Sequence, residues 1–259
     1  MHPLRGIGVL VTRPEQQAMP LCRLLQIQGA DTFRLPAVDI KPLERGRALA
    51  ARLGALENYD LIIFVSGNAV RFGAALLDQK RELCIAAVGP ATAHALNQAG
   101  YRVAVQPNAG FDSENLLMHP QLGRVAGHRI LLIKGSGGRK LLEEELRRRG
   151  ANVVVAEVYE RVRSSPSEAD LEALQEHFAS DEVHVIIATS AEIAANLLDM
   201  ATPALRGEFA RVHWLVPSAR VADAVRAHGL QAPLLTAASA ENQDLVAALI
   251  RWRSTESGA

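Results

Sequence analysis

Two stretches of this chain carry nearly the same pattern: LIIFVSGNA at residues 61–69 and VIIATSAE at residues 185–192. Each is a short apolar run that stops at a serine and continues into a helical pattern. A short apolar run bounded by a turn is typical of a strand buried on both faces, as in parallel sheets. The duplication therefore predicts two similar α/β lobes, and two lobes predict a cleft between them.

The similarity continues downstream of both stretches. A second apolar run leads into a small polar turn and an Ala-rich helical segment, at residues 87–100 and again at 215–229. An acidic segment suited to capping a further helix follows each block, at residues 113–117 and 239–242. The chain is thus predicted to contain two copies of one α/β unit.

The composition is that of an ordinary globular protein, with 259 residues, of which 49% are hydrophobic and 22% charged. The formal net charge is +0, so no overall basic field favours nucleic acid or a membrane surface. Cys22 and Cys84 have neither metal nor redox spacing, which favours a reducing compartment. The start of the chain lacks the apolar core of a signal peptide, and no apolar run approaches the roughly 20 residues of a membrane span. We therefore expect a cytoplasmic protein with no nucleic acid and no membrane partner.

Strand and helix patterns alternate along the chain, which predicts a doubly wound α/β architecture with parallel, flavodoxin-like sheets. The expected strands are residues 7–11, 61–65, 84–88, 130–133, 152–158, 184–188 and 212–216. The expected helices are residues 15–28, 46–56, 68–78, 92–99, 139–149, 167–178, 191–199, 219–228 and 242–252.

Local signals mark several helix ends. The run from Ser165 to Glu168 predicts a capping box with Pro166 at the first helical position. The run from Thr12 to Glu15 follows the same logic, with Thr12 as the cap. Three glycines stand where helices are expected to stop: Gly100, Gly150 and Gly229.

Two segments fit neither copy of the repeat. Residues 38–42 are extended and flanked by prolines, and residues 156–162 mostly alternate between polar and apolar residues. We interpret both as interdomain connector strands, so that a second α/β domain at residues 43–155 is inserted into a first one formed by residues 1–37 and 163–259. A contiguous split near residue 165 is the alternative. The insertion is favoured because the C-terminal block alone has too few strands for a sheet.

Signatures of common catalytic and metal sites are missing from the sequence. The eight histidines show no HExxH or other metal spacing, and there is no GxSxG elbow. The Gly-rich stretch KGSGGRK at residues 134–140 matches neither a P-loop nor a dinucleotide fingerprint. Its glycines and the start of the next helix nevertheless suit an anion between Lys134 and Arg139. A tight turn with solvated charges is the alternative interpretation.

Five hydroxyl residues follow expected strands: Thr12, Ser66, Thr92, Ser190 and Ser218. Taken singly, each is most simply a helix N-cap. All five nevertheless fall at the carboxyl ends of strands, the edge at which doubly wound sheets bind ligands. Two such edges facing each other would line a cleft with hydroxyls and helix N-termini, which suits a polyanion.

Taken in order, the motifs resemble those of bacterial uroporphyrinogen-III synthases over nearly the whole chain. They are VLVTRP (9–14), SGNAV (66–70), VGPATA (88–93), GSGGR (135–139) continuing to Leu142 and Gly150, VYER (158–161), TS (189–190) and PSARVA (217–222). The resemblance implies two α/β domains joined by a two-stranded connector, one inserted into the other. It also implies a hydro-lyase of tetrapyrrole (heme or siroheme) biosynthesis.

The substrate implied by the resemblance is hydroxymethylbilane, a linear tetrapyrrole polycarboxylate. Its conversion to uroporphyrinogen III removes water and inverts the last pyrrole ring, ring D, through a spiro-pyrrolenine intermediate in the usual account. No cofactor and no metal are implied. Tyr159 matches the family's favoured candidate for assisting departure of the hydroxyl. The residues expected to bind substrate are Thr12, Arg13, Ser66, Gly67, Asn68, Thr92, Lys134, Gly135, Arg139, Ser190 and Ser218.

Two positions depart from the family pattern. Lys134 stands where relatives often carry Arg, so a compact ammonium replaces a bidentate fork. Ala219 follows Ser218 where many relatives have a Thr. We expect a monomer that receives its substrate by transient hand-over from the preceding deaminase. The alternative function is a non-catalytic two-lobed module that binds a tetrapyrrole or another small ligand, or an inactive relative of the synthases.

Overall fold

The chain divides into two compact units. The computed structural model describes residues 2–43, 49, 53, 56–77, 83–107, 110 and 112–256. Unit 1 comprises Met1–Asp39 and Val162–Ala259, and unit 2 comprises Ile40–Arg161. The helix predicted over residues 46–56 lies mostly outside the described residues. Within the described ranges, none of the helices combines the length and the apolar character needed to cross a membrane.

Unit 1 is built on a five-stranded sheet with the strand order β10-β9-β8-β1-β2. All neighbouring strands pair in parallel. Counted in chain order within the unit, this arrangement is that of flavodoxin-like sheets, whose ligand edge lies where the strand order reverses. The strands are β1 (Gly8–Val11), β2 (Asp31–Arg34), β8 (Val185–Ile187), β9 (His213–Val216) and β10 (Leu234–Thr236).

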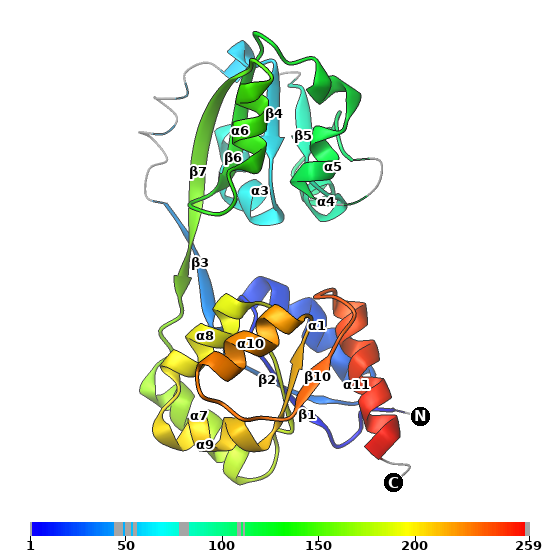
Figure 1. Ribbon diagram of the computed structural model, residues 1–259, viewed down its shortest axis with the longest axis vertical. Coiled ribbons are helices and arrows are strands. Elements are labelled where there is room, and N and C mark those ends of the chain that lie inside the picture. The colour runs from blue at the N-terminus through cyan, green and yellow to red at the C-terminus, as the bar shows by residue number, and fades with distance from the viewer. Residues whose placement is uncertain are drawn as a thin grey trace. The chain divides into compact units, whose positions relative to one another are not determined.

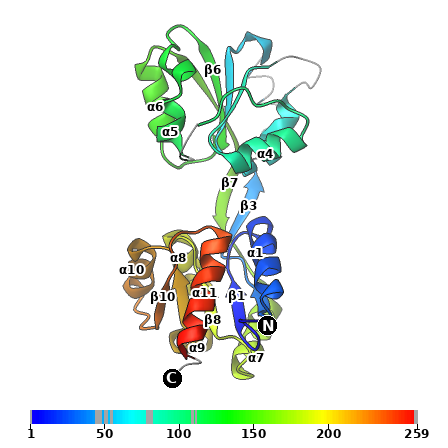
Figure 2. The same ribbon diagram turned by 90° about the vertical axis from the view of Figure 1, so that its right-hand side faces the viewer.

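Helices cover both faces of this sheet (Figure 1). On one face α1 (Glu15–Ile27) packs beside α11 (Asn242–Glu256), as Figure 2 shows. On the other face α8 (Ala191–Met200) packs against α10 (Ala219–Ala227). Two further helices, α7 (Glu168–Ala179) and α9 (Pro203–Arg211), contact each other. Because both faces are covered, β1 and β8 are buried throughout and show no polar alternation.

Unit 2 is also built on a five-stranded sheet, with the order β3-β7-β6-β4-β5. The pairs β4–β5, β4–β6 and β6–β7 are parallel, so this part of the sheet repeats the strand order of unit 1. The strands are β3 (Val38–Pro42), β4 (Leu61–Phe64), β5 (Ile85–Ala87), β6 (Arg129–Gly135) and β7 (Asn152–Arg163). The boundary between the two units falls within both β3 and β7, which are neighbours in this sheet.

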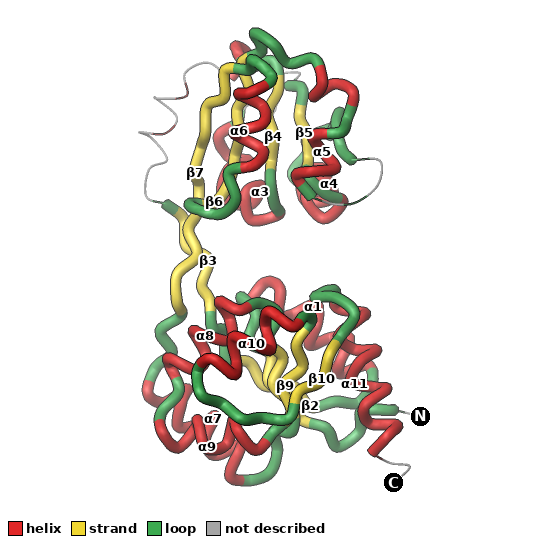
Figure 3. The backbone as a smooth tube through the Cα atoms, viewed as in Figure 1, coloured by secondary structure: helices red, strands yellow, loops and turns green. Residues whose placement is uncertain are grey.

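The sheet of unit 2 is likewise enclosed by helices on both faces, as the tube in Figure 3 shows for each unit. On one face α3 (Gly67–Gly73) packs against α4 (Pro90–Gln98), and on the other α5 (Ser113–Leu117) packs against α6 (Leu141–Arg148). The described residues of the unit also include three short 3₁₀ helices: η1 (Leu56–Asn58), η2 (Ala74–Leu76) and η3 (Pro120–Gly123). The duplication seen in the sequence is therefore a duplication of topology.

Among the strands and α-helices of the described residues, four were not in the predicted set: β2, β10, α5 and α9. The strands β2 and β10 lie at the two edges of the unit 1 sheet, and their side chains remain partly exposed. An edge strand needs no continuous apolar run, so the sequence signal that identified the central strands is weak there. In α9 the pattern is weakened by Gly207, which lies inside the helix.

The predicted helix stops are confirmed, whereas two predicted starts are wrong. Gly100, Gly150 and Gly229 adopt positive φ angles of 86°, 86° and 76° just after α4, α6 and α10. The capping box of α7 pairs Ser167 with Asp170, because the helix begins at Glu168 rather than at Pro166. Thr12 does not cap α1, which begins three residues later at Glu15.

Candidate functional site

In unit 2 the point where the strand order reverses lies between β4 and β6. Ser66 follows β4 and caps α3, since its Oγ accepts a hydrogen bond from the Ala69 backbone N–H at 3.1 Å. The same Oγ lies 3.2 Å from the hydroxyl oxygen of Tyr159, and either hydroxyl is able to donate. Gly67 and Asn68 form the first two residues of α3. Ser66 is therefore both the predicted N-cap and a partner of the predicted catalytic tyrosine.

Tyr159 lies on β7 with only 9% of its surface exposed. Its ring packs directly on Gly135 of β6, where a Cβ atom would lie 2.5 Å from the ring carbon Cζ. The β6–β7 register shifts between Lys134 and Gly135, which brings Gly135 opposite Tyr159. Phe72 lies beside the ring, with centroids 5.9 Å apart. A glycine is thus needed at position 135 to make room for the ring of Tyr159, and not only to form the turn.

Lys134, next to last in β6, is only 8% exposed, which is unusual for a lysine residue. Among the described residues, none forms a hydrogen bond or ion pair with its side chain. Glu157 is its register neighbour on β7, but this carboxylate instead accepts from the Gly137 backbone N–H at 3.3 Å. The stem of the side chain is buried, while its ammonium group keeps access to solvent. An ammonium with no counter-charge among the described residues is available to a bound anion.

The Gly-rich turn after β6 contains Gly137 and Gly138, both with positive φ angles. Arg139, at the end of this turn, is exposed and pairs with Glu114 of α5, with Nη1 and Oε1 2.5 Å apart. Its guanidinium is therefore engaged by a carboxylate of the protein, an ion pair for which the sequence pattern gives no signal. Any ligand carboxylate that binds Arg139 must share it with Glu114 or displace it.

Thr92 differs from its prediction as a helix cap. Gly89 occupies the N-cap position of α4, Pro90 is the first helical residue, and Thr92 lies inside the first turn. Its side chain is buried, with 5% of its surface exposed. The offset follows from Pro90, whose fixed φ angle favours the first helical position.

In unit 1 the strand order reverses between β1 and β8. Thr12, directly after β1, is fully buried and donates its hydroxyl to the Ile187 carbonyl at 2.6 Å. Arg13 donates from Nε to Thr189 Oγ1 at 3.3 Å, from Nη1 to Asn242 Oδ1 at 2.6 Å and from Nη2 to the Ala240 carbonyl at 2.7 Å. Each guanidinium nitrogen therefore already donates to the protein.

The electrostatic setting of Arg13 reflects this partial burial. Burial lowers the pKa of the Arg13 guanidinium, and the nearby carboxylate of Glu241 acts in the opposite direction. An arginine in this setting stays charged at physiological pH. Its charge therefore helps to hold the start of α11 close to the turn after β1.

The two serines of unit 1 differ in how the protein uses them. Ser190 caps α8, with its Oγ accepting from the Ile193 backbone N–H at 3.2 Å. Ser218 occupies the N-cap position of α10, but its exposed side chain makes no capping hydrogen bond. The Ser218 hydroxyl is thus available to an external partner.

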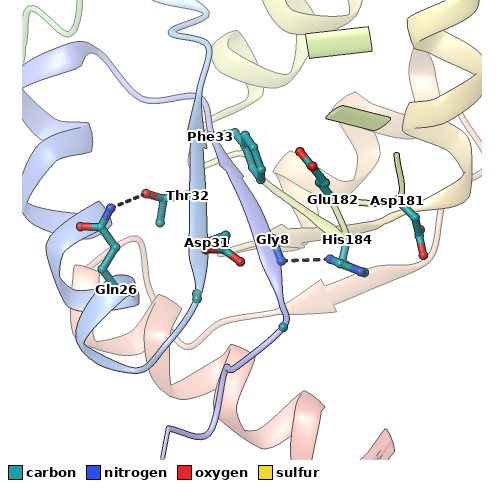
Figure 4. Close-up of a pocket in the computed structure, with 10 residues that line it drawn as sticks. Gly8, Gln26, Asp31, Thr32, Phe33, Asp181, Glu182 and His184 are labelled. Atoms are coloured by element: carbon teal, nitrogen blue, oxygen red, sulfur yellow. Dashed lines mark hydrogen bonds between the residues drawn. The ribbon is translucent and has the colours of Figure 1, made fainter. Parts of the chain in front are cut away.

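A pocket of about 590 Å³ lies in unit 1 at the opposite edge of the sheet (Figure 4). It is lined by Gly8, which begins β1, together with Asp31, Phe33, Glu182 and His184. The ring nitrogen Nδ1 of His184 accepts a hydrogen bond from the Gly8 backbone N–H at 2.9 Å. Because this pocket surrounds the amino ends of parallel strands, it contains none of the predicted site residues.

Several partners of the predicted site residues had no signal in the sequence. Asn242 meets Arg13 across a separation of 229 residues, and Glu114 meets Arg139 across 25. Neither pair stands at a spacing that a helix or a strand would bring together. Only the tertiary arrangement of the strand edges reveals them.

The fold and these edges define an α/β protein of two flavodoxin-like domains joined by a two-stranded connector, with hydroxyl-bearing turns at the carboxyl ends of its strands. Solved structures share this fold, among them the following two. Uroporphyrinogen III synthase from Thermus thermophilus, solved as a mutant form, gives a TM-score of 0.52 at 22% identity, covering 98% of this chain and 100% of the other. The synthetase from Helicobacter pylori 26695 gives 0.59 at 14% identity, covering 95% and 99%.

Sequence relatives establish the family. The family described as uroporphyrinogen-III synthase HemD matches residues 20–247. The uroporphyrinogen-III synthases of Escherichia coli and Salmonella typhimurium are 32% and 33% identical, each alignment covering 94% of this chain and 100% of the relative. This chain belongs to the uroporphyrinogen-III synthase family.

Proposed function

We propose that this chain is a uroporphyrinogen-III synthase, which cyclises hydroxymethylbilane to uroporphyrinogen III with loss of water and inversion of ring D. Family membership over residues 20–247 is the observation that carries the proposal. The reaction makes the chain a hydro-lyase of tetrapyrrole biosynthesis that acts on a small-molecule substrate. Because the bilane also closes spontaneously without inversion, the enzyme has to control geometry as well as supply reactivity.

Tyr159 is the proton source that assists departure of the substrate hydroxyl. A phenol is protonated at neutral pH and able to donate, and general acid assistance typically accelerates such a step by ~10²–10⁴-fold. The ring is held by Gly135 and by Phe72, and the hydroxyl by Ser66. This fixed orientation supports an acid that is in place before the substrate arrives.

Lys134 binds a substrate carboxylate. Its stem is buried and its ammonium group lacks an acidic partner among the described residues, so a ligand carboxylate would supply the counter-charge. The glycines that follow it expose backbone N–H groups, and α6 begins close by. Arg139 serves as a second cation of this turn by exchanging Glu114 for substrate.

In unit 1 the expected binding residues divide into two groups. Ser218, with an unused hydroxyl, and the N-terminus of α8 at Ser190 are suited to contact substrate oxygens. Thr12 and Arg13 hold that edge in place, because the Thr12 hydroxyl and each guanidinium nitrogen of Arg13 already donate to the protein. Gly67, Asn68 and Thr92 have the corresponding supporting role around α3 and α4 in unit 2.

An isomer assay tests the function directly. Hydroxymethylbilane is generated in situ, the purified chain is added, and the products are oxidised and separated as porphyrin isomers by chromatography. Enrichment of isomer III over the spontaneous isomer I supports the synthase. An unchanged isomer ratio contradicts it and favours a non-catalytic tetrapyrrole-binding module.

Three further assignments belong to this proposal. The chain acts as a monomer, which light scattering after gel filtration would test. It acts in the cytoplasm, consistent with free thiols at Cys22 and Cys84.

The chain receives the bilane by transient hand-over from the preceding deaminase, since a substrate that closes spontaneously is lost while it diffuses. The test adds a reagent that captures bilane free in solution without affecting the enzymes. A fall in the yield of isomer III would count against the hand-over.

A further inference from the structure

The hydroxyl of Tyr159 forms a hydrogen bond with another hydroxyl rather than facing open solvent. Its oxygen lies 3.2 Å from Ser66 Oγ, and Tyr159 is 9% exposed whereas Ser66 is only partly buried. We propose that Ser66 is the catalytic residue that delivers the proton to the departing hydroxyl, and that Tyr159 acts through it as the proton source. The inference rests on the proposed synthase function and concerns the path of the proton.

Ser66 is held in place by the helix that it caps. Its Oγ accepts from the Ala69 backbone N–H at 3.1 Å, which uses one acceptor position and fixes the side-chain orientation. A serine hydroxyl has two acceptor lone pairs and one O–H. Accepting also from Tyr159 fills the second lone pair, so the serine O–H is left over for a ligand.

The number of donors in the pair supports this direction. Two hydroxyls contribute two O–H groups, their mutual hydrogen bond uses one, and the Ala69 N–H occupies only an acceptor position. One O–H therefore remains. A phenol is more acidic than an alcohol, so the phenol is the better donor and the alcohol the better acceptor. Two accepted hydrogen bonds further polarise the Ser66 O–H and strengthen it as a donor.

Tyr159 is not free to turn toward a ligand. Its ring rests on Gly135 with no room for even a Cβ atom between them, and Phe72 lies beside it. Its backbone carbonyl also accepts from the Ser136 N–H at 2.7 Å, which ties this point of β7 to the Gly-rich turn. The packing thus keeps the phenol directed at Ser66.

The resulting step balances in atoms and charge. The bond between the substrate carbon and its hydroxyl oxygen breaks with the electron pair staying on oxygen. That oxygen takes the Ser66 proton, and water leaves. Ser66 takes the Tyr159 proton in the same step, which leaves a phenolate. Ring closure then releases a proton from the attacked pyrrole carbon, and this proton restores the phenol without any oxidant or reductant.

Single-turnover rates of isomer III formation test the relay. Ser66→Asn keeps a good N-cap but removes the hydroxyl, and Tyr159→Phe removes the proton source. Each is expected to lower the rate by about 100-fold. The double variant is expected to lose no more rate than a single variant does, because the pair acts as one unit. Ser66→Thr retains the hydroxyl and is expected to stay within about threefold of wild type. The dependence of the wild-type rate on the D₂O fraction, in H₂O/D₂O mixtures, is expected to fit a step in which two protons are transferred together.

The controls distinguish loss of the relay from loss of a helix cap and from absence of the synthase function. Thr202→Ala removes the equivalent cap of α9, where Thr202 Oγ1 accepts from Leu205 at 3.2 Å, and is expected to leave the rate unchanged. A Ser66→Asn rate close to wild type beside a slow Tyr159→Phe rate would overturn the relay and place Tyr159 itself against the substrate. The wild-type isomer ratio is measured first, so failure of the synthase function is seen before any variant is compared.

Discussion

The guanidinium of Arg13 and the side-chain carbonyl of Asn242 are joined by a hydrogen bond of 2.6 Å between Nη1 and Oδ1. The same guanidinium reaches Thr189 and the Ala240 carbonyl. One side chain therefore ties the turn after β1 to the turn after β8 and to the start of α11. This junction lies where the strand order of the unit 1 sheet reverses, so it fixes the edge that carries Ser190.

Arg13→Lys is expected to lower the free energy of unfolding by about 1–3 kcal/mol, because an ammonium cannot reach three separated acceptors. Urea unfolding followed by tryptophan fluorescence measures this in unit 1, where Trp214 and Trp252 both lie. Asn242→Ala should destabilise less. The double variant should be less destabilised than the sum of the two, since both changes remove the same hydrogen bond. Strict additivity would contradict this coupling.

Gly135→Ala is expected to slow single-turnover isomer III formation by at least about tenfold. The new Cβ atom would lie 2.5 Å from Tyr159 Cζ, so the ring must move away from Ser66. Gly207→Ala is the matched control, because its Cβ meets nothing within 4 Å inside α9. The control should stabilise the chain by up to about 1 kcal/mol without changing the rate. A Gly135→Ala variant as fast as wild type would show that the ring position is unimportant.

Lys134→Met is expected to affect the free energy of unfolding and the binding of substrate differently. Replacing the lysine with an apolar chain of similar length should leave the free energy of unfolding unchanged to within about 0.5 kcal/mol, because the ammonium group has no partner among the described residues to lose. The KM for the bilane should rise at least about tenfold, since one carboxylate loses its counter-charge. Lys134→Arg should retain most of the affinity. Steady-state kinetics and calorimetry measure the two effects, and an unchanged KM would exclude Lys134 from the binding site.

His213 should make unit 1 less stable in mild acid. Burial lowers the pKa of His213, with the carboxylate of Glu256 opposing, and the imidazole packs at a tilt against Trp252 with ring centroids 4.8 Å apart. The unfolded chain then binds this proton more readily than the folded one, so stability falls as pH drops through about 6.5 toward the lower folded pKa. His213→Gln should flatten the dependence between about pH 7 and pH 5. Tryptophan fluorescence at a series of pH values measures the slope, and an equal slope in both proteins would refute the assignment.

The sequence alone determined the features that depend on neighbours along the chain. Apolar runs identified the central strands β1, β4, β6, β8 and β9, because burial on both faces leaves no polar alternation. Glycines marked the ends of α4, α6 and α10 through the left-handed conformation that they tolerate. Ser66 and Ser190 were recognisable as caps, since a cap bonds to a backbone N–H three residues away. The order of these motifs was enough to indicate the family.

Only the tertiary structure decided what the individual site residues contact. Arg13 was expected to bind substrate, and the structure adds that each of its guanidinium nitrogens donates to a protein partner, one of them 229 positions away. Gly135 was expected to belong to an anion-binding turn, yet it also makes room for the ring of Tyr159 on the adjacent strand. Such contacts depend on strand order and register, which bring together carboxyl ends of strands far apart in sequence. Local patterns specify elements, whereas the packing of those elements selects the partners of each side chain.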